Sequence, residues 1–430
     1  MAHQHPIRNP GLLGIVDQLN PSGYQYYAGY SEQFVEDVLL ELSLPATAVV
    51  LDPWNGSGTT TQVSEDIGVS SVGLDANPVM VVVAKARCLD PGVHGSLDSL
   101  CDDIIFKARR YRCGLRLEPD PLSSWFVGSG ILACRKLQRA IHVLLTPSDT
   151  QNAPQRADHI DALSDLAAFF YVALFRTVRL LASPFRTSNP TWIRVPPSAE
   201  RREIAASTVL DMFRYHIGVM GEALSARRCT IGPKAILRMA DSAAIPMDSS
   251  TVSAVISSPP YCTRIDYAVA TRPELAVLGF DPQTGLKELR RRLIGSPTIM
   301  QGDLALQPAW GQRCMDLLES VSEHPAKSSR SYYYRQYLQY FDSIFRSLQE
   351  INRVLTHGGR CVLVVQDSYF KGIHVDLPLM FEDMSHSLGW TLSRRQDFTK
   401  RRTMAGMNPK IRKYRDTCSA TESALFFLKG

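Results

Sequence analysis

Two short stretches of the chain contain residue types that suit chemistry on a bound ligand. In "VSAVISSPPYC", at 252–262, an apolar strand runs directly into Ser258, Pro259, Pro260 and Tyr261. Proline donates no hydrogen bond to a sheet and its φ is fixed, so the two prolines end the strand and stiffen the turn. The turn therefore holds a hydroxyl and an aromatic ring in one geometry, which favours the orientation of a reacting group.

The second stretch is "LDPWNGSGTT", at 51–60, a glycine loop between a predicted strand and a predicted helix. Gly56 and Gly58 let the backbone approach a ligand, and the helix N-terminus offers free N–H groups. The loop lacks the lysine of GxxxxGK[ST] and the third glycine of GxGxxG, so neither common phosphate-binding motif is present. Asp75 ends the next strand, where a carboxylate can accept hydrogen bonds from both hydroxyls of a ribose. Asp75 also fits a helix cap, because it precedes "ANP".

Alternating strands and helices position these loops. Strands are predicted at 47–51, 69–75, 235–239, 252–257, 361–366, 390–396 and 423–428, and helices at 31–44, 77–89, 332–355 and 376–388. This alternation predicts a parallel sheet with helices on both faces. The turns after the first four strands, including the one that begins at Asp241, then share the edge where open α/β sheets bind ligands.

Two insertions interrupt this pattern. Residues 92–230 contain long helical stretches, which predict a helical insertion and a candidate target-recognition domain. Residues 281–330 are polar and weakly periodic, which predicts a second, smaller insertion. The catalytic domain would then consist of residues 1–91 and 231–430.

Composition predicts a soluble globular protein. The chain has 430 residues, of which 45% are hydrophobic and 21% charged. The longest apolar stretch, 166–175, is too short to span a membrane, and the N-terminus resembles no secretory signal, so we expect a cytoplasmic protein. Nine cysteines are scattered without CxxC spacing, which indicates buried thiols rather than disulfides or a zinc site. No metal is expected.

The two motifs together resemble those of the S-adenosylmethionine-dependent amino-methyltransferases that act on DNA. "DPWNGSGTT" resembles the cofactor loop "DPFxGSGTT" of that family, and "SPPY" resembles its catalytic tetrapeptide. The resemblance implies an α/β class I methyltransferase fold, Rossmann-like, with a mixed, mostly parallel seven-stranded sheet bearing the helical insertion. It covers roughly residues 24–90 and 235–430.

The resemblance also implies a cofactor site. Asp52, Gly56, Ser57, Gly58 and Thr59 would surround the methionine part of S-adenosylmethionine, and Asp75 would bind its ribose. Asp241 and Ser242 would lie near the adenine amine. The segment "YYAGYSEQFV" looks like the N-terminal cofactor motif of the family, which places Tyr30 and Ser31 near the methionine carboxylate.

The tetrapeptide then has a chemical role. The exocyclic amine of a base is a poor nucleophile, because its lone pair is delocalised into the ring. Ser258 Oγ and the carbonyl of Ser258 or Pro259 would accept from its N–H groups, and Tyr261 would stack on a base flipped out of the duplex. The form "SPPY" resembles the one most often seen in enzymes that methylate the 4-amino group of cytosine, whereas "DPPY" and "NPPY" are commoner for the 6-amino group of adenine; a serine hydroxyl can serve either base. Methylation of carbon-5 of cytosine needs a cysteine nucleophile, which in the enzymes of that family directly follows a proline. Because Tyr261 separates Cys262 from Pro260, we interpret Cys262 as a buried thiol and not as a nucleophile.

The resemblance implies double-stranded DNA as the substrate and a restriction endonuclease, encoded separately, as a companion enzyme. Whether the chain forms a homodimer is left open. The segment 394–415 contains nine lysines or arginines and a single acidic residue, Asp397. This excess of positive charge indicates either contacts with phosphates or a solvated loop. Target reading is expected in the helical insertion, in 281–330 or in this basic loop. Two other functions stay open: methylation of an RNA amine, and a catalytically silent homologue that binds nucleic acid. The residues expected to contact substrate are Arg264, Tyr267, Arg394, Arg395, Lys400, Arg401 and Arg402.

Overall fold

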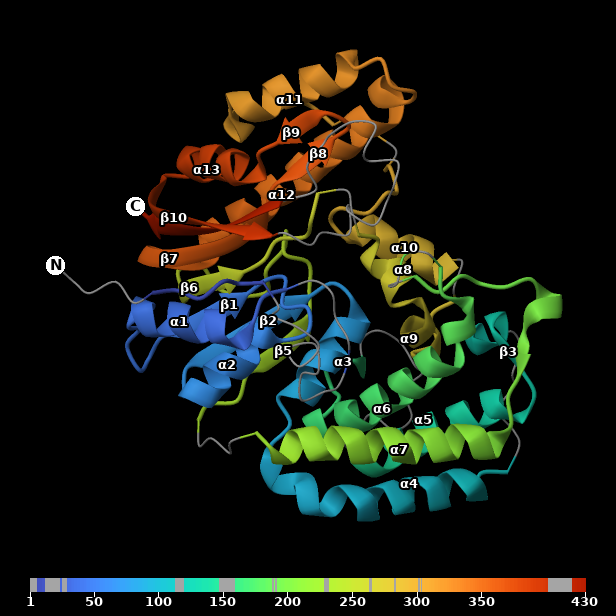
Figure 1. Ribbon diagram of the computed structural model, residues 1–430. Helices are drawn as coiled ribbons and strands as arrows, with labels where there is room; N and C mark the ends of the chain where they lie inside the picture. The colour runs from blue at the N-terminus through green and yellow to red at the C-terminus, as the bar shows by residue number, and fades with distance from the viewer. Residues whose placement is uncertain are drawn as a thin grey trace.

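Seven strands form one mixed sheet in the order β10-β11-β7-β6-β1-β2-β5 (Figure 1). Six of them run in the same direction, and β11 is antiparallel to both of its neighbours, β7 and β10. This is the class I methyltransferase sheet expected from the sequence. The strands are β1 (Val49–Asp52), β2 (Ser70–Asp75), β5 (Ile236–Met239), β6 (Val252–Ser257), β7 (Leu355–Gln366), β10 (Trp390–Lys400) and β11 (Ala420–Lys429).

The computed structural model describes residues 6–11, 24, 29–112, 120–146, 159–187, 189, 192–227, 232–262, 265–281, 284–300, 302, 304–400 and 420–430, without the side chain of Lys400. Its helices are α1 (Glu32–Leu42), α2 (Thr59–Ile67), α3 (Pro78–Arg87), α4 (Leu97–Arg110), α5 (Ser129–Leu145), α6 (Asp165–Leu181), α7 (Ala206–Ser225), α8 (Tyr267–Ala270), α9 (Arg272–Val277), α10 (Thr284–Arg292), α11 (Gln312–Glu323), α12 (Tyr334–Val354) and α13 (Leu377–Ser387). Short 3-10 helices span Pro91–Ser96, Pro121–Ser124, Ser183–Phe185, Ser198–Glu200 and Pro308–Trp310, and a π-helical turn spans Ser329–Tyr333.

Both faces of the sheet are covered, so its central strands are apolar on both sides. On one face Phe34 and Val38 of α1 pack with Val50, Ile256 and other strand residues. On the other face α11, α12 and α13 pack against the alternate residues of the same strands, as the layers of Figure 1 illustrate.

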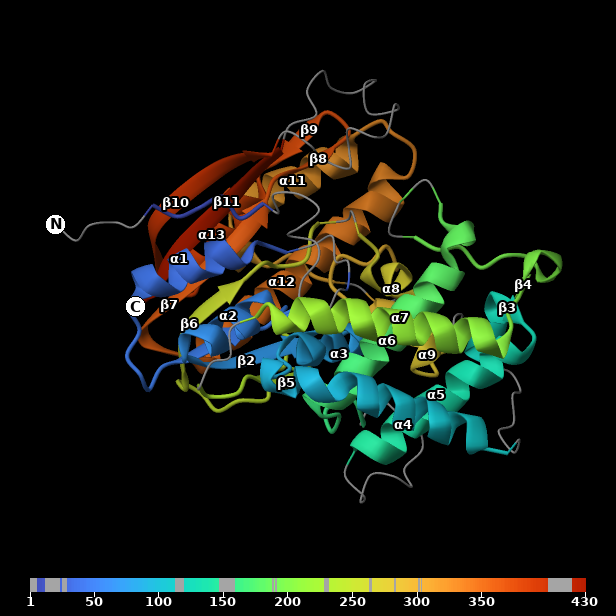
Figure 2. The same cartoon turned by 60° about the horizontal axis from the view of Figure 1, so that its bottom comes forward.

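The helical insertion packs against the end of the sheet domain that carries α3. Helices α4 to α7 form one hydrophobic cluster with α3 and α9, and they lie side by side in both views (Figure 2). Every residue of α3 is buried, because the sheet lies on one side of it and α6 on the other. The insertion and the sheet domain therefore share a core, while the domain boundaries at 91 and 230 stay a prediction.

The structure adds elements that the sequence did not indicate. The segment 281–330, expected to be weakly periodic, contains α10 and α11, whose leucines are buried. Two small two-stranded sheets also form: the antiparallel hairpin β8 (Ser368–Phe370) with β9 (Ile373–Val375), and the parallel pair β3 (Phe126–Val127) with β4 (Arg202–Glu203).

Two observations bear on composition. The six cysteines within the described residues, among them Cys262, are buried thiols, as expected. In the same part of the chain, no helix combines the length and the apolar character that crossing a membrane requires.

Candidate cofactor and substrate site

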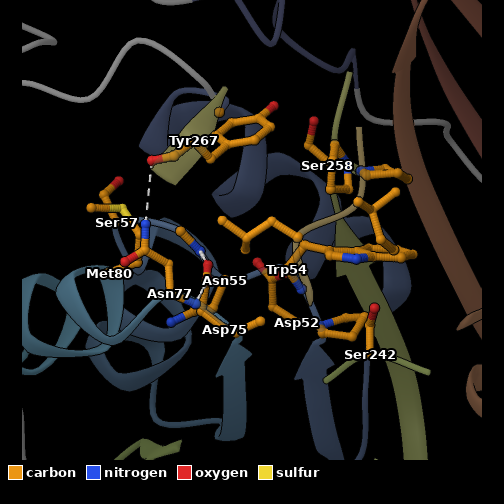
Figure 3. A pocket seen from close by; sticks show the side chains of 18 of the residues that line it. Asp52, Trp54, Asn55, Ser57, Asp75, Asn77, Met80, Ser242, Ser258 and Tyr267 are labelled. Atoms are coloured by element: carbon orange, nitrogen blue, oxygen red, sulfur yellow. Dashed lines mark hydrogen bonds between the residues drawn. The ribbon is translucent and has the colours of Figure 1, made fainter. Parts of the chain in front are cut away.

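A cavity lies at the edge of the sheet where the parallel strands end, and it has a volume of about 1260 Å³ including the part open to solvent. Its lining comes from the glycine loop, the end of β2, the turn after β5, the tetrapeptide and the insertion. In Figure 3, Ser258 and Tyr267 lie on one side of the pocket and Asp52, Asn55 and Asp75 on the other. The structure thus brings Gly56 of the glycine loop and Tyr261 of the tetrapeptide to one cavity.

Asp52 ends β1 and ties three segments together beneath this cavity. Its carboxylate accepts hydrogen bonds from Thr60 Oγ1 at 2.6 Å, Ser257 Oγ at 2.5 Å and Tyr30 Oη at 3.1 Å. Burial raises the pKa of Asp52, although these hydrogen bonds partly offset that effect. The side chain therefore fixes the start of α2, the end of β6 and the segment before α1 relative to one another.

The glycine loop has a backbone that only glycine adopts without strain. Gly56 has φ 50° and Gly58 has φ 84°, both in the left-handed region. A Cβ added at Gly58 would lie 2.8 Å from Cβ of Ala84 on α3. The loop thus packs directly on α3, which leaves its other side facing the cavity.

Asp75 links the loop to β2 and presents its carboxylate to the cavity. Oδ2 accepts from Gly56 N at 2.9 Å, and Oδ1 accepts from Asn77 N at 2.8 Å. A carboxylate has about four lone-pair positions, so two remain for hydroxyl donors. Burial raises the pKa of Asp75 to about 6, against the effect of these two hydrogen bonds. The helix cap itself is Asn77, whose side chain accepts from Val79 N at 3.1 Å.

Asp241 and Ser242 line the cavity after β5. Asp241 Oδ1 accepts from Ala243 N at 2.9 Å, and Ser242 Oγ lies 2.8 Å from Ser347 Oγ of α12, with which it shares a hydrogen bond. These contacts hold the turn in place at a different part of the cavity from the glycine loop.

The tetrapeptide is held at three of its positions. Ser258 Oγ donates to the carbonyl of Val364 on β7 at 3.2 Å, so its lone pairs remain available as acceptors. The carbonyl of Pro260 accepts from Tyr340 Oη of α12 at 3.0 Å. Tyr261 N donates to Tyr267 Oη at 3.2 Å. Two tyrosines from separate helices thus supplement the stiffness that the prolines provide.

Some expected site residues lie elsewhere. Ser31 caps α1, with its Oγ accepting from Phe34 N at 3.3 Å, and neither it nor Gly58 lines the cavity. Arg394 packs on the Phe426 ring and forms an ion pair of 3.0 Å with Glu41 on α1. Arg395 bonds Asp397 at 2.8 Å. Arg264, Arg401 and Arg402, like the side chain of Lys400, lie outside the described part of the chain, so their roles stay predictions.

The cavity also contains residues that sequence reasoning missed. Trp54 and Asn55 lie within the glycine motif but were not among the predicted site residues. Arg179 of α6 and Arg292 at the end of α10 belong to the two insertions. Nothing in the local sequence around Arg179 signals this place, because it depends on how α6 packs on α3.

Two known proteins are similar to this chain in sequence. No family model matches the chain. It is 24% identical over 286 residues to Type II methyltransferase M.BsoBI of Geobacillus stearothermophilus, covering 62% of this chain and 54% of that protein. It is 21% identical over 381 residues to Type II methyltransferase M.MvaI of Kocuria varians, covering 82% of this chain and 77% of that protein.

Both of these proteins are Type II methyltransferases, so the similarity is to that class of enzyme at low sequence identity. The chain spans about half the length of the first of these relatives and about three quarters of the second.

Proposed function

We propose that this chain transfers a methyl group from S-adenosylmethionine to the 4-amino group of cytosine in double-stranded DNA. The observation that carries the proposal is that the tetrapeptide 258–261 and the glycine loop with Asp75 line one cavity. An acceptor for an amine and a cradle for a nucleoside are thereby close enough to serve one reaction. The two Type II methyltransferases to which the chain is similar support the same chemistry.

The residues present fit this cofactor. Asp75 keeps two acceptor positions for the ribose hydroxyls. The indole Nε1 of Trp54 is buried without a hydrogen-bond partner among the described residues, which leaves a donor for a polar ligand atom. Asp241 and Ser242 supply polar groups for an adenine at the other part of the cavity. When bound, S-adenosylmethionine supplies a methyl group on a positively charged sulfur.

The chain's own contribution is to hold the amine nitrogen. Ser258 Oγ, with its proton engaged by Val364, accepts from one N–H and so localises the nitrogen lone pair. The stiffened turn keeps that acceptor in register with the ring of Tyr261, on which the base would stack. The target atom is out of reach inside a duplex, so the base must be flipped into the cavity.

DNA contacts are proposed for the insertions and for the basic loop. Tyr267 lines the cavity beside the tetrapeptide. Arg264 and the run 400–402 are offered for backbone phosphates, and the helical insertion for target reading. A separately encoded restriction endonuclease, a dimeric state and a location with the chromosome belong to the same proposal.

Expression in a host that lacks DNA methylation, followed by sequencing that detects modified bases, tests this function. We expect N4-methylcytosine at one short motif, and far less of it with Ser258→Ala. Modified adenine at a motif would favour 6-amino transfer instead. Transfer to RNA and not to DNA would overturn the DNA assignment. Cofactor binding by calorimetry without transfer to DNA or RNA would identify a silent homologue.

A further inference from the structure

We propose that Arg179, a residue of the helical insertion, binds the carboxylate of the cofactor's amino-acid part, an inference that rests on the proposed function. Among the described residues that line the cavity, Arg179 and Arg292 are the only cations. They border different parts of it. Arg292 lines a second hollow together with Asp241, whereas Arg179 contacts Tyr24 and Ala270.

The adenine end of the cofactor is neutral and its amino-acid end carries a carboxylate, so the two ends need different partners. With adenine at Asp241 and Ser242, the amino-acid part must extend past the glycine loop, away from Arg292. A carboxylate there needs cationic or N–H donors, because burying an unpaired anion is costly. The side chains that the resemblance offered are neutral and already engaged: Tyr30 with Asp52 and Thr60, and Ser31 with the start of α1.

Arg179 has a free edge for this role. Its Nε and Nη2 engage the two carboxylate oxygens of Glu274 on α9, the Nη2–Oε2 distance being 2.7 Å. Nη2 also donates to the carbonyl of Ala270 at 2.5 Å, and its distance to Tyr24 Oη is 3.4 Å. Nη1 makes no hydrogen bond to any described residue, and 19% of the side chain is exposed. A guanidinium has five N–H donors and can join two carboxylates at once.

Glu274 and α9 set the position of this guanidinium. The Glu274 side chain has no solvent exposure, so the ion pair is fixed inside the shared core of the insertion and the sheet domain. Arg179 is therefore held in advance and loses little side-chain freedom on binding. In this arrangement the insertion completes the cofactor site, in addition to any contact that it makes with the target.

Calorimetry with S-adenosylhomocysteine and with its carboxamide analogue, which has the same size but lacks the negative charge, tests the inference. We expect the wild-type protein to bind the carboxylate form about 10- to 100-fold more tightly. Arg179→Gln would leave the Glu274 carboxylate buried without its cationic partner, so the variant to use is Arg179→Gln with Glu274→Gln. It should lose most of that preference while it binds the carboxamide about as well as wild type does. Arg292→Gln, at the other cavity cation, should keep the preference.

The outcomes separate the inference from the function. A wild-type protein that binds both ligands equally overturns the role of Arg179, whatever the variants do, and leaves the methyltransferase proposal intact. A double variant that loses equal affinity for both ligands shows a role in packing only, which also overturns it. A wild-type protein that binds neither ligand contradicts the proposed function itself.

Discussion

Cofactor affinity should depend on pH through Asp75. The ribose hydroxyls donate to this carboxylate, so only its ionised form binds them well. With a pKa of about 6 in the free protein, about one carboxylate in eleven is ionised at pH 5 and about ten in eleven at pH 7. The apparent affinity scales with the competent fraction. It should therefore be about tenfold weaker at pH 5 than at pH 7 and should level off above pH 7.

The sign of this effect distinguishes it from folding. Because the folded state raises the pKa of Asp75, this group favours the folded state most at low pH, and that contribution is lost as pH rises through about 6. Ligand affinity changes in the opposite direction, so a loss of folded protein at low pH is a separate effect. Unfolding followed by fluorescence at each pH checks for it.

The assay is calorimetry with S-adenosylhomocysteine at half-unit steps from pH 5 to pH 7. Asp75→Asn should bind more weakly at pH 7 and should flatten the profile, since an amide does not titrate. Asp52 also has a raised pKa, but its carboxylate is engaged beneath the cavity and is retained in the variant. A wild-type affinity that is constant across this range, or a variant with the same slope as wild type, would refute the reasoning.

Three further substitutions have defined outcomes. Ser258→Ala should reduce methyl transfer by about 100-fold or more with cofactor affinity unchanged in calorimetry, because one acceptor for the amine is lost; a merely structural role would weaken both. Gly58→Ala should destabilise the fold by about 1–3 kcal/mol in denaturant unfolding, owing to its φ and the 2.8 Å approach to α3. Gly68→Ala is the control, because Gly68 has a similar φ of 81° but nothing lies within 4 Å of its added Cβ. The difference in stability between the two variants therefore measures the close approach to α3. Arg135→Met should lower the free energy of unfolding by about 3–5 kcal/mol, because Asp120 is left buried and unpaired.

The sequence predicted those parts of the site that local chemistry encodes. The loop at 56–58 and the turn at 258–261 carry their geometry in their own residues, since glycine permits the backbone and proline fixes it. The alternation of strands and helices then predicts a parallel sheet with helices on both faces, whereas the mixed, seven-stranded form of the sheet was implied by the resemblance to methyltransferases. The cavity edge follows from that topology, because the polar turns after parallel strands meet at one edge.

The missed parts depend on contacts between distant segments. Arg179 is more than a hundred residues from the glycine loop, and only the packing of α6 on α3 brings it to the cavity. Conversely, the net charge of the run from 394 does not reveal which arginines are already paired, as Arg394 is with Glu41. The number of positive charges indicates a segment that could contact DNA, but the ion pairs within the protein determine which of its side chains remain available for such contacts.

Two arginines of the helical insertion contact α9 and so connect the insertion to the cavity. Arg135 of α5 donates from Nη2 to the carbonyl of Ala276 at 2.8 Å and from Nη1 to the carbonyl of Val277 at 2.6 Å, both at the end of α9, and its Nε and Nη2 bond the carboxylate of Asp120. Arg179 of α6 holds Glu274 of the same short helix. A helix of six residues has little stability of its own, so these two arginines maintain it. Since α8 and α9 come shortly after the tetrapeptide in the chain, the insertion holds the segment that follows the tetrapeptide, and it also supplies part of the cavity lining.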